Sequence, residues 1–259
     1  MKKWAMVVLL LLLAGGAMAQ QSDEATLAAV NEYTAGQEAL KKGNLDVAIR
    51  AFEKAVSLNP ELFISHYYLG AAYQAKQDSA NTLKHFRKYL EKVGVDTGSA
   101  EAAAANRGVG VNLYRSKKMA EAVPYLQRAV RMMPKDKEVH FFLGMALRET
   151  DETGAEKHFA KVIDLDPKLA LPYYYAGRIA FKNKNTAAAQ TRLEGFLNRE
   201  AKGPRAAQAH YMLGSLAAQA GDNAKAASHF EKYLVEEPGG AQAPEVKKFL
   251  DDYKAQQGS

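Results

Sequence analysis

The sequence predicts an all-α fold, a solenoid in which six helical hairpins stack one after another. A small residue recurs with spacings of 34, 40, 34, 33 and 37 residues, at Gly36, Gly70, Gly110, Gly144, Gly177 and Gly214. In most repeats a second small residue follows 11 or 12 positions later, and a large apolar residue follows that one by four. This pattern is typical of two amphipathic helices that cross where neither carries a bulky side chain.

The first repeat shows the pattern most completely. Gly36 and Ala48 are the small residues expected at the crossing of its two helices, and Phe52 is the large residue that packs there. Gly43 marks the turn between the helices, and Pro60 closes the repeat. Such a hairpin is too small to fold alone, so its stability depends on the neighbouring repeats.

The chain begins MKKWAMVVLLLLLAGGAMAQ, which predicts a secretory signal peptide over residues 1–19, cleaved after Ala19. The alternative is a retained membrane anchor. The apolar segment from Trp4 to Ala19 has 16 residues, and a spanning helix needs roughly 20. We therefore expect a periplasmic or secreted protein with no membrane span after cleavage, in which residues 20–28 form a linker.

The repeats are predicted at residues 29–62, 63–96, 103–136, 137–169, 170–203 and 207–240. An insertion at residues 97–102 and extra residues near Pro204 lengthen the helices that follow, since Ser99 suits an N-cap and Pro204 a first helical position. Residues 241–259 are expected to be a capping helix, from Pro244 to Gln256, and a tail.

A period of 34 residues with these small and large positions resembles the tetratricopeptide repeat (TPR) family, here an exported bacterial member. The resemblance covers Ala29 to Gly240. It implies a right-handed α-α superhelix whose first helices line a concave groove, and this groove would bind an extended or helical peptide segment of a partner protein. The second repeat departs from the family pattern, because Thr82 stands where a small alanine belongs.

The groove residues are predicted at positions three before and one, four and five after each repeated glycine. The candidates are Tyr67, Arg107, Tyr114, Arg115, Phe141, Met145, Arg148, Tyr174, Arg178, Phe181, Lys182 and Tyr211. Aromatic rings beside guanidinium and ammonium groups suit a peptide with apolar and acidic side chains. The alternative is that the aromatic residues only pack against neighbouring helices.

The composition argues against other classes of function. The net charge of +6 includes no basic cluster that would indicate a nucleic-acid partner, and the absence of cysteine excludes thiolate chemistry. No nucleophile or phosphate-binding motif is present, so we expect neither an enzyme nor a cofactor. All six histidines belong to the second, fourth and sixth repeats, at His66, His85, His140, His158, His210 and His229. Because no third ligand recurs with them, a structural role is favoured over a metal site.

Taken together, these features predict an exported scaffold for protein–protein interaction. Involvement in assembly of envelope machinery is implied by the family resemblance alone. A self-associating adaptor, in which terminal repeats stack on another copy, is the main alternative, and an enzyme subunit is a weaker one.

Overall fold

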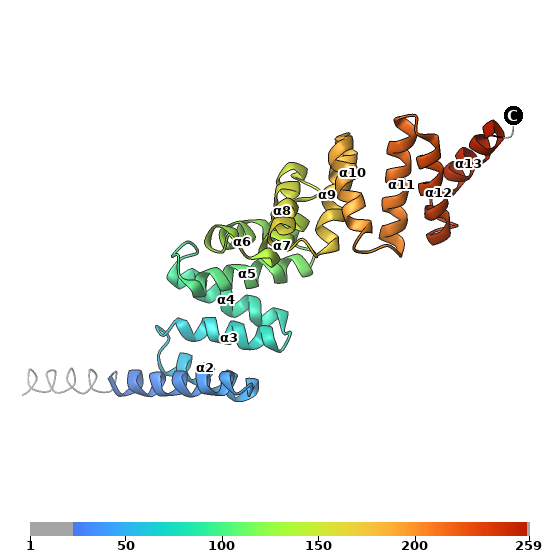
Figure 1. Ribbon diagram of the computed structural model, residues 1–259. Helices are drawn as coiled ribbons and strands as arrows, with labels where there is room; N and C mark the ends of the chain where they lie inside the picture. The colour runs from blue at the N-terminus through green and yellow to red at the C-terminus, as the bar shows by residue number, and fades with distance from the viewer. Residues whose placement is uncertain (1–22, 258–259) are drawn as a thin grey trace, which may run out of the picture. The chain divides into compact units, whose positions relative to one another are not determined.

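The structure, a computed structural model, describes residues 23–257 of the chain. It contains two compact units, which meet in the sequence between Pro134 and Lys135. In both units the described residues form α-helices joined by short turns (Figure 1). The predicted signal peptide, residues 1–19, lies outside the described residues.

The first unit contains three helical hairpins. A helix at residues 23–41 precedes α2 (Leu45–Leu58), α3 (Ile64–Ala75) pairs with α4 (Ser79–Val93), and α5 (Ala100–Arg115) pairs with α6 (Met119–Met132). The first helix therefore includes residues 23–28, which we had predicted to be a linker. The linker prediction is wrong for these residues, because the run from Asp23 to Ala29 contains neither glycine nor proline to stop the helix.

The second unit contains three further hairpins and a final helix. Its hairpins are α7 (Lys137–Leu147) with α8 (Glu152–Leu165), α9 (Ala170–Lys182) with α10 (Thr186–Leu197), and α11 (Pro204–Gln219) with α12 (Asn223–Glu236), and α13 (Ala243–Gln257) follows. The prediction that the chain is built from successive helical hairpins is thus confirmed. Within residues 23–257, no helix combines the length and the apolar content needed to cross a membrane.

Each of the six repeated glycines lies against the large residue of its own hairpin. A β-carbon added to one of them would come within 2.4–2.9 Å of that side chain. The pairs are Gly36 with Phe52, Gly70 with Phe86, Gly110 with Leu126, Gly144 with Phe159, Gly177 with Leu193 and Gly214 with Phe230. The glycines are therefore needed for close helix packing, as the sequence predicted, and we call them the crossing glycines.

The turn inside each hairpin has a fixed backbone geometry. Seven residues after five of the crossing glycines, the chain adopts a left-handed conformation with φ between 57° and 79°, at Gly43, Gln77, Lys117, Lys184 and Gly221. The fourth repeat is one residue shorter, and its Asp151 instead has φ −146° and accepts a hydrogen bond from the Gly154 N–H at 2.9 Å. The fourth turn therefore lacks the left-handed residue, and its capping residue comes one position earlier than the caps Asp78 and Asp222 of other hairpins.

Caps account for the two lengthened helices. Ser99 Oγ accepts the Ala102 N–H at 3.0 Å at the start of α5, and Pro204 opens α11 as its first residue. Both features were predicted. Pro124 is the sixth residue of α6, just past the first turn, so the helix lacks the hydrogen bond that an N–H there would donate to the Ala120 carbonyl.

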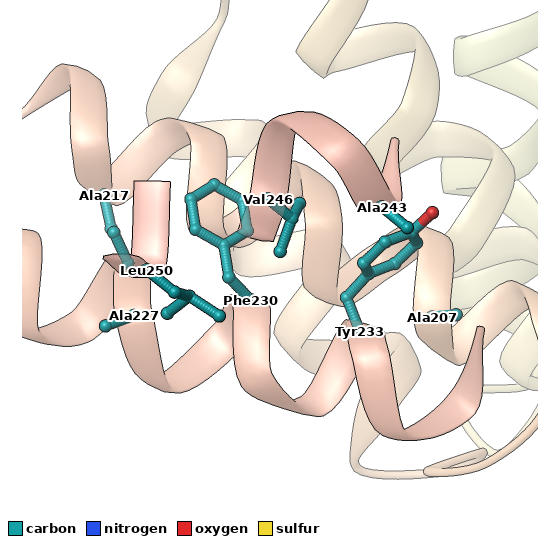
Figure 2. Close-up of a cluster of buried hydrophobic side chains, with 9 residues drawn as sticks. Ala207, Ala217, Ala227, Phe230, Tyr233, Ala243, Val246 and Leu250 are labelled. Carbon is teal, nitrogen blue, oxygen red and sulfur yellow. The ribbon is translucent and has the colours of Figure 1, made fainter. Parts of the chain in front are cut away.

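The final helix α13 covers the apolar side of α12 (Figure 2). Val246 and Leu250 of α13 are buried against Phe230, and the ring of Phe249 meets the ring of Phe230 edge-on at 5.0 Å. Figure 2 also shows Tyr233 beside Ala243, where α13 begins. The capping helix predicted at Pro244–Gln256 is therefore present and is one residue longer at each end.

Candidate functional site

The first helices of the second unit form a cavity of about 300 Å³ on one face. Its wall contains five of the predicted residues, Arg148, Arg178, Phe181, Lys182 and Tyr211. They come from the end of α7, from α9 and from α11, which are the first helices of three successive repeats. Stacking of the repeats therefore brings residues of different hairpins to one cavity.

Two of the three cations in this cavity already have acidic partners. Lys182 forms an ion pair with Glu152, and this hydrogen bond raises the pKa of Lys182. Arg148 Nε lies 3.1 Å from Oε1 of its neighbour Glu149. Both pairs are exposed to solvent, so each contributes little to stability.

Arg178 differs from these two cations because no Asp or Glu among the described residues pairs with it. Its guanidinium carbon lies 5.7 Å from the centre of the Tyr174 ring, a cation–π geometry that holds the positive charge at the surface. Burial raises the pKa of Tyr174, and the positive charges of Arg178 and Arg205 oppose that rise. The Arg178 guanidinium also donates a hydrogen bond to the Tyr174 hydroxyl, and its remaining N–H donors are available to an external acceptor.

Two predicted groove residues of the second unit are buried. Met145 is 9% exposed and Tyr174 is 6% exposed, so neither side chain offers a partner much surface. Tyr174 packs in the core with Leu193 and Phe196. For these two positions the structure favours the packing role that the sequence left open.

Phe141, the remaining predicted residue of this unit, belongs to a different cavity. It lines an apolar space of about 390 Å³ together with Leu169, Leu171 and Pro172. The space lies at the N-terminal ends of α7 and α9, whereas the first cavity lies toward their C-terminal ends. The sequence did not predict this cavity, because Leu169 precedes the helix and lies outside the groove positions.

The predicted residues of the first unit are less clearly a binding surface. Tyr67 is half-buried, and its ring lies 5.8 Å from that of Phe86 and 5.6 Å from that of Tyr89. Arg107 is also half-buried, and its positive charge acts on the Tyr67 hydroxyl. Tyr114 is half-buried on α5. Arg115 lines a polar cavity of about 540 Å³.

Five of the six residues that stand three positions before a crossing glycine are aromatic, and most of them pack in the same way. Four of the five contact the large aromatic residue of their own hairpin at ring distances of 5.8–6.2 Å, in the pairs Tyr33–Phe52, Tyr67–Phe86, Phe141–Phe159 and Tyr211–Phe230. The fifth, Tyr174, packs instead against Phe196, with ring centres 5.1 Å apart. Packing is therefore a shared role of this position. Phe141 and Tyr211 also line cavities, so they combine packing with access to a ligand.

The six histidines form three pairs, each between the two helices of one hairpin. The Nδ1 atoms are 3.0 Å apart in His66–His85, 2.9 Å in His140–His158 and 3.0 Å in His210–His229. Burial lowers the pKa of one member of each pair to about 4, namely His85, His158 and His210. Among residues 23–257 there is no group of three His, Cys, Asp or Glu side chains that could hold a metal ion. Each pair is thus a neutral hydrogen bond inside a hairpin, in which one imidazole donates and the other accepts.

Comparison with known proteins decides the family. A model of the tetratricopeptide repeat matches residues 72–137, 110–170 and 174–241, and a second TPR repeat model matches residues 36–77. The chain belongs to the tetratricopeptide repeat family. No curated protein sequence matches this TPR chain.

Solved structures agree with the family assignment. The TPR protein YrrB, described as having an unusual peptide-binding site, is 25% identical with a TM-score of 0.61, over 70% of this chain and 91% of YrrB. A MamA protein is 19% identical with a TM-score of 0.56, over 67% of this chain and 92% of MamA. PilF of Pseudomonas aeruginosa is 21% identical with a TM-score of 0.55, over 88% of this chain and 98% of PilF. The last two establish the fold alone. As a TPR protein, the chain is a scaffold for protein–protein interaction, and relatives of this kind are typically not enzymes.

Proposed function

We propose that this TPR protein binds an acidic peptide segment of a partner protein on the first-helix face of its second unit. The observation that supports the proposal concerns Arg178, an exposed cation in the wall of the first cavity. No Asp or Glu among the described residues pairs with it. A carboxylate is the natural partner for a guanidinium group, because the two can form parallel charge-assisted hydrogen bonds. The neighbouring rings of Phe181 and Tyr211 offer apolar surface to the rest of the peptide.

The peptide preference can be measured directly with paired peptides. Each acidic peptide is compared with a copy in which Asp and Glu are replaced by Asn and Gln, using fluorescence anisotropy and the purified full chain. The acidic copy should bind more tightly, and Arg178→Gln should remove the difference. Lys161→Gln is the matched control, since Lys161 is an exposed cation of α8 outside both cavities. Equal binding of acidic and amide peptides by the unaltered protein would refute the proposal.

We also propose that the protein acts after export, in the periplasm or outside the cell, where such scaffolds can assist envelope assembly. The support is the sequence pattern of residues 1–19. Mass spectrometry of the protein from fractionated cells tests it: a new N-terminus at Gln20 is expected. A cytoplasmic protein that retains Met1 would contradict export, and a membrane-bound one would indicate an anchor.

Self-association is a second candidate function, favoured by one observation. Leu27, Val30 and Val47 of the first hairpin are 63%, 41% and 48% exposed. Apolar side chains at the end of a repeat array can pack against another copy. Light scattering over a range of protein concentrations separates the two candidates, because a monomer at every concentration excludes the second.

A further inference from the structure

The second unit has two cavities of different chemistry on the same helices. The first is the cavity around Arg178, and the second is the apolar cavity formed by Phe141, Leu169, Leu171 and Pro172. Both have in their walls residues of α7 and α9 or residues directly flanking those helices, and residues of α11 also line the first cavity. One ligand that follows these helices would therefore meet both.

The two cavities lie on one face of each helix. Phe141 and Arg148 are seven residues apart along α7 and its C-cap, and Leu171 and Arg178 are seven residues apart along α9. Seven residues complete almost two full helical turns, so the members of each pair project in nearly the same direction. At 1.5 Å per residue, the cavities are separated by about 10 Å along both helices.

The charges along this path favour an acidic group at one end only. Within residues 23–257 no Asp or Glu pairs with Arg178, whereas Lys137, at the other end, pairs with Asp166 at 2.6 Å. Leu169 is 38% exposed, so the apolar cavity is open to a side chain from outside. A ligand with an apolar group at one end and a carboxylate at the other would match both ends.

We infer that the second unit recognises an extended peptide motif in which a leucine or aromatic side chain and an Asp or Glu are separated by three positions. The apolar side chain occupies the cavity beside Phe141 and Leu169, and the carboxylate binds Arg178. This inference rests on the proposed peptide-binding function and specifies its ligand.

The three-residue separation follows from backbone geometry. In a polyproline II segment the rise is about 3.1 Å per residue with three residues per turn, so side chains three positions apart point the same way and lie about 9 Å apart. A helical ligand would need a separation of seven residues to span the same distance. A helix that short is marginal in water, so the extended form loses less free energy on binding.

A peptide series tests the spacing. Labelled proline-rich peptides carry one Leu and one Glu separated by one to six positions, and one alanine-rich helical peptide carries them seven positions apart. Binding to the full chain is measured by fluorescence anisotropy. We expect the tightest binding at three positions, with about tenfold loss when Glu is replaced by Gln or Leu by Ser.

Protein variants assign each end of the motif. Arg178→Gln should remove the effect of the peptide Glu and leave the effect of the peptide Leu. Leu169→Ser should do the reverse, and serine at this position suits the N-cap of α9, so the helix should be retained. Lys161→Gln should change neither effect, and circular dichroism should show that all three variants remain helical.

The outcomes separate this inference from the function on which it rests. Acidic peptides that bind through Arg178 without a spacing preference, or that bind best as the helical peptide, would overturn the motif and keep the proposed function. If no acidic peptide is preferred to its amide copy, both are overturned.

Discussion

A β-carbon added to Gly108 would lie 2.4 Å from Cε2 of Phe86. Gly70 approaches the opposite edge of the same ring, with an added β-carbon 2.4 Å from Cδ1. The buried Phe86 ring is thus enclosed between a crossing glycine of its own hairpin and a glycine of the next repeat. Gly108 therefore determines how closely the second and third hairpins pack.

Gly108→Ala should destabilise the first unit by about 1–3 kcal/mol, because the enclosed ring cannot move away from the added methyl group. Urea denaturation followed by circular dichroism measures the effect. Gly239→Ala is the control, since no described residue other than its two chain neighbours has an atom within 4 Å of a β-carbon added there. Equal stability of the two variants would show that the contact at Phe86 is not tight.

Substituting glycine at the left-handed turn residues should stabilise the hairpins. Gln77, Lys117 and Lys184 have φ of 57–61°, a conformation that costs a non-glycine residue about 1–2 kcal/mol. Glycine removes this cost, but part of the stabilisation is offset by the greater entropy of glycine in the unfolded chain. We expect Lys184→Gly to raise the free energy of unfolding by about 0.5–1 kcal/mol, measured by urea denaturation.

In the fourth repeat Asp151 also lies seven residues after the crossing glycine, but this shorter turn has no left-handed residue. The Asp151 backbone is not left-handed, and its side chain caps α8. Asp151→Gly should therefore destabilise the protein slightly, by roughly a few tenths of a kcal/mol, from loss of the cap. If Lys184→Gly and Asp151→Gly change stability in the same direction, the proposed difference between the two turns is wrong.

The histidine pairs should make folding stability depend on pH between about 4 and 6.5. Burial lowers the pKa of His85, His158 and His210 to about 4 in the folded protein, while an unfolded histidine titrates near 6.5. In this window the unfolded chain binds more protons, so stability is complete above pH 6.5 and is lost as the pH falls toward 4.

The charges around each pair support this direction. Lysine side chains near each pair disfavour the protonated imidazole. They are Lys84 and Lys88 at His66 and His85, Lys157 at His158, and Lys232 at His210 and His229. Asp151 opposes this effect at His158, as do Glu236 at His210 and Glu194 at His229, but burial is the largest cause at each pair.

Urea denaturation at several pH values between 4 and 7.5 checks the prediction. The double variant His66→Gln with His85→Gln should reduce the slope of stability against pH, because one of the three titrating pairs is removed. The pKa values of Asp46, Asp78 and Asp166 are lowered below the usual 3.8. These carboxylates therefore change the folding stability at a pH below the window in which the histidines act. A slope that is unchanged in the double variant would contradict the assignment to histidine.

The repeats could be predicted from the sequence because each hairpin depends on local features: a glycine, a small residue and a large residue at fixed separations. The role of Gly108 could not, because it serves a contact between repeats and lies outside the period. The pairing of Lys182 with Glu152 also escaped prediction, since it joins side chains 30 residues apart on different helices. Burial of Met145 and Tyr174 depends on how far neighbouring helices overlap, which the spacing of residues does not specify.

Nuclear magnetic resonance of the Arg178 guanidinium tests the central claim most directly. With the side chain assigned by comparison with Arg178→Lys, an acidic peptide is added and the Nε–H resonance of Arg178 is followed. Binding of the carboxylate should shift this resonance, and the amide copy of the peptide should leave it unchanged. A peptide that binds the chain without shifting the Arg178 resonance would contradict the account.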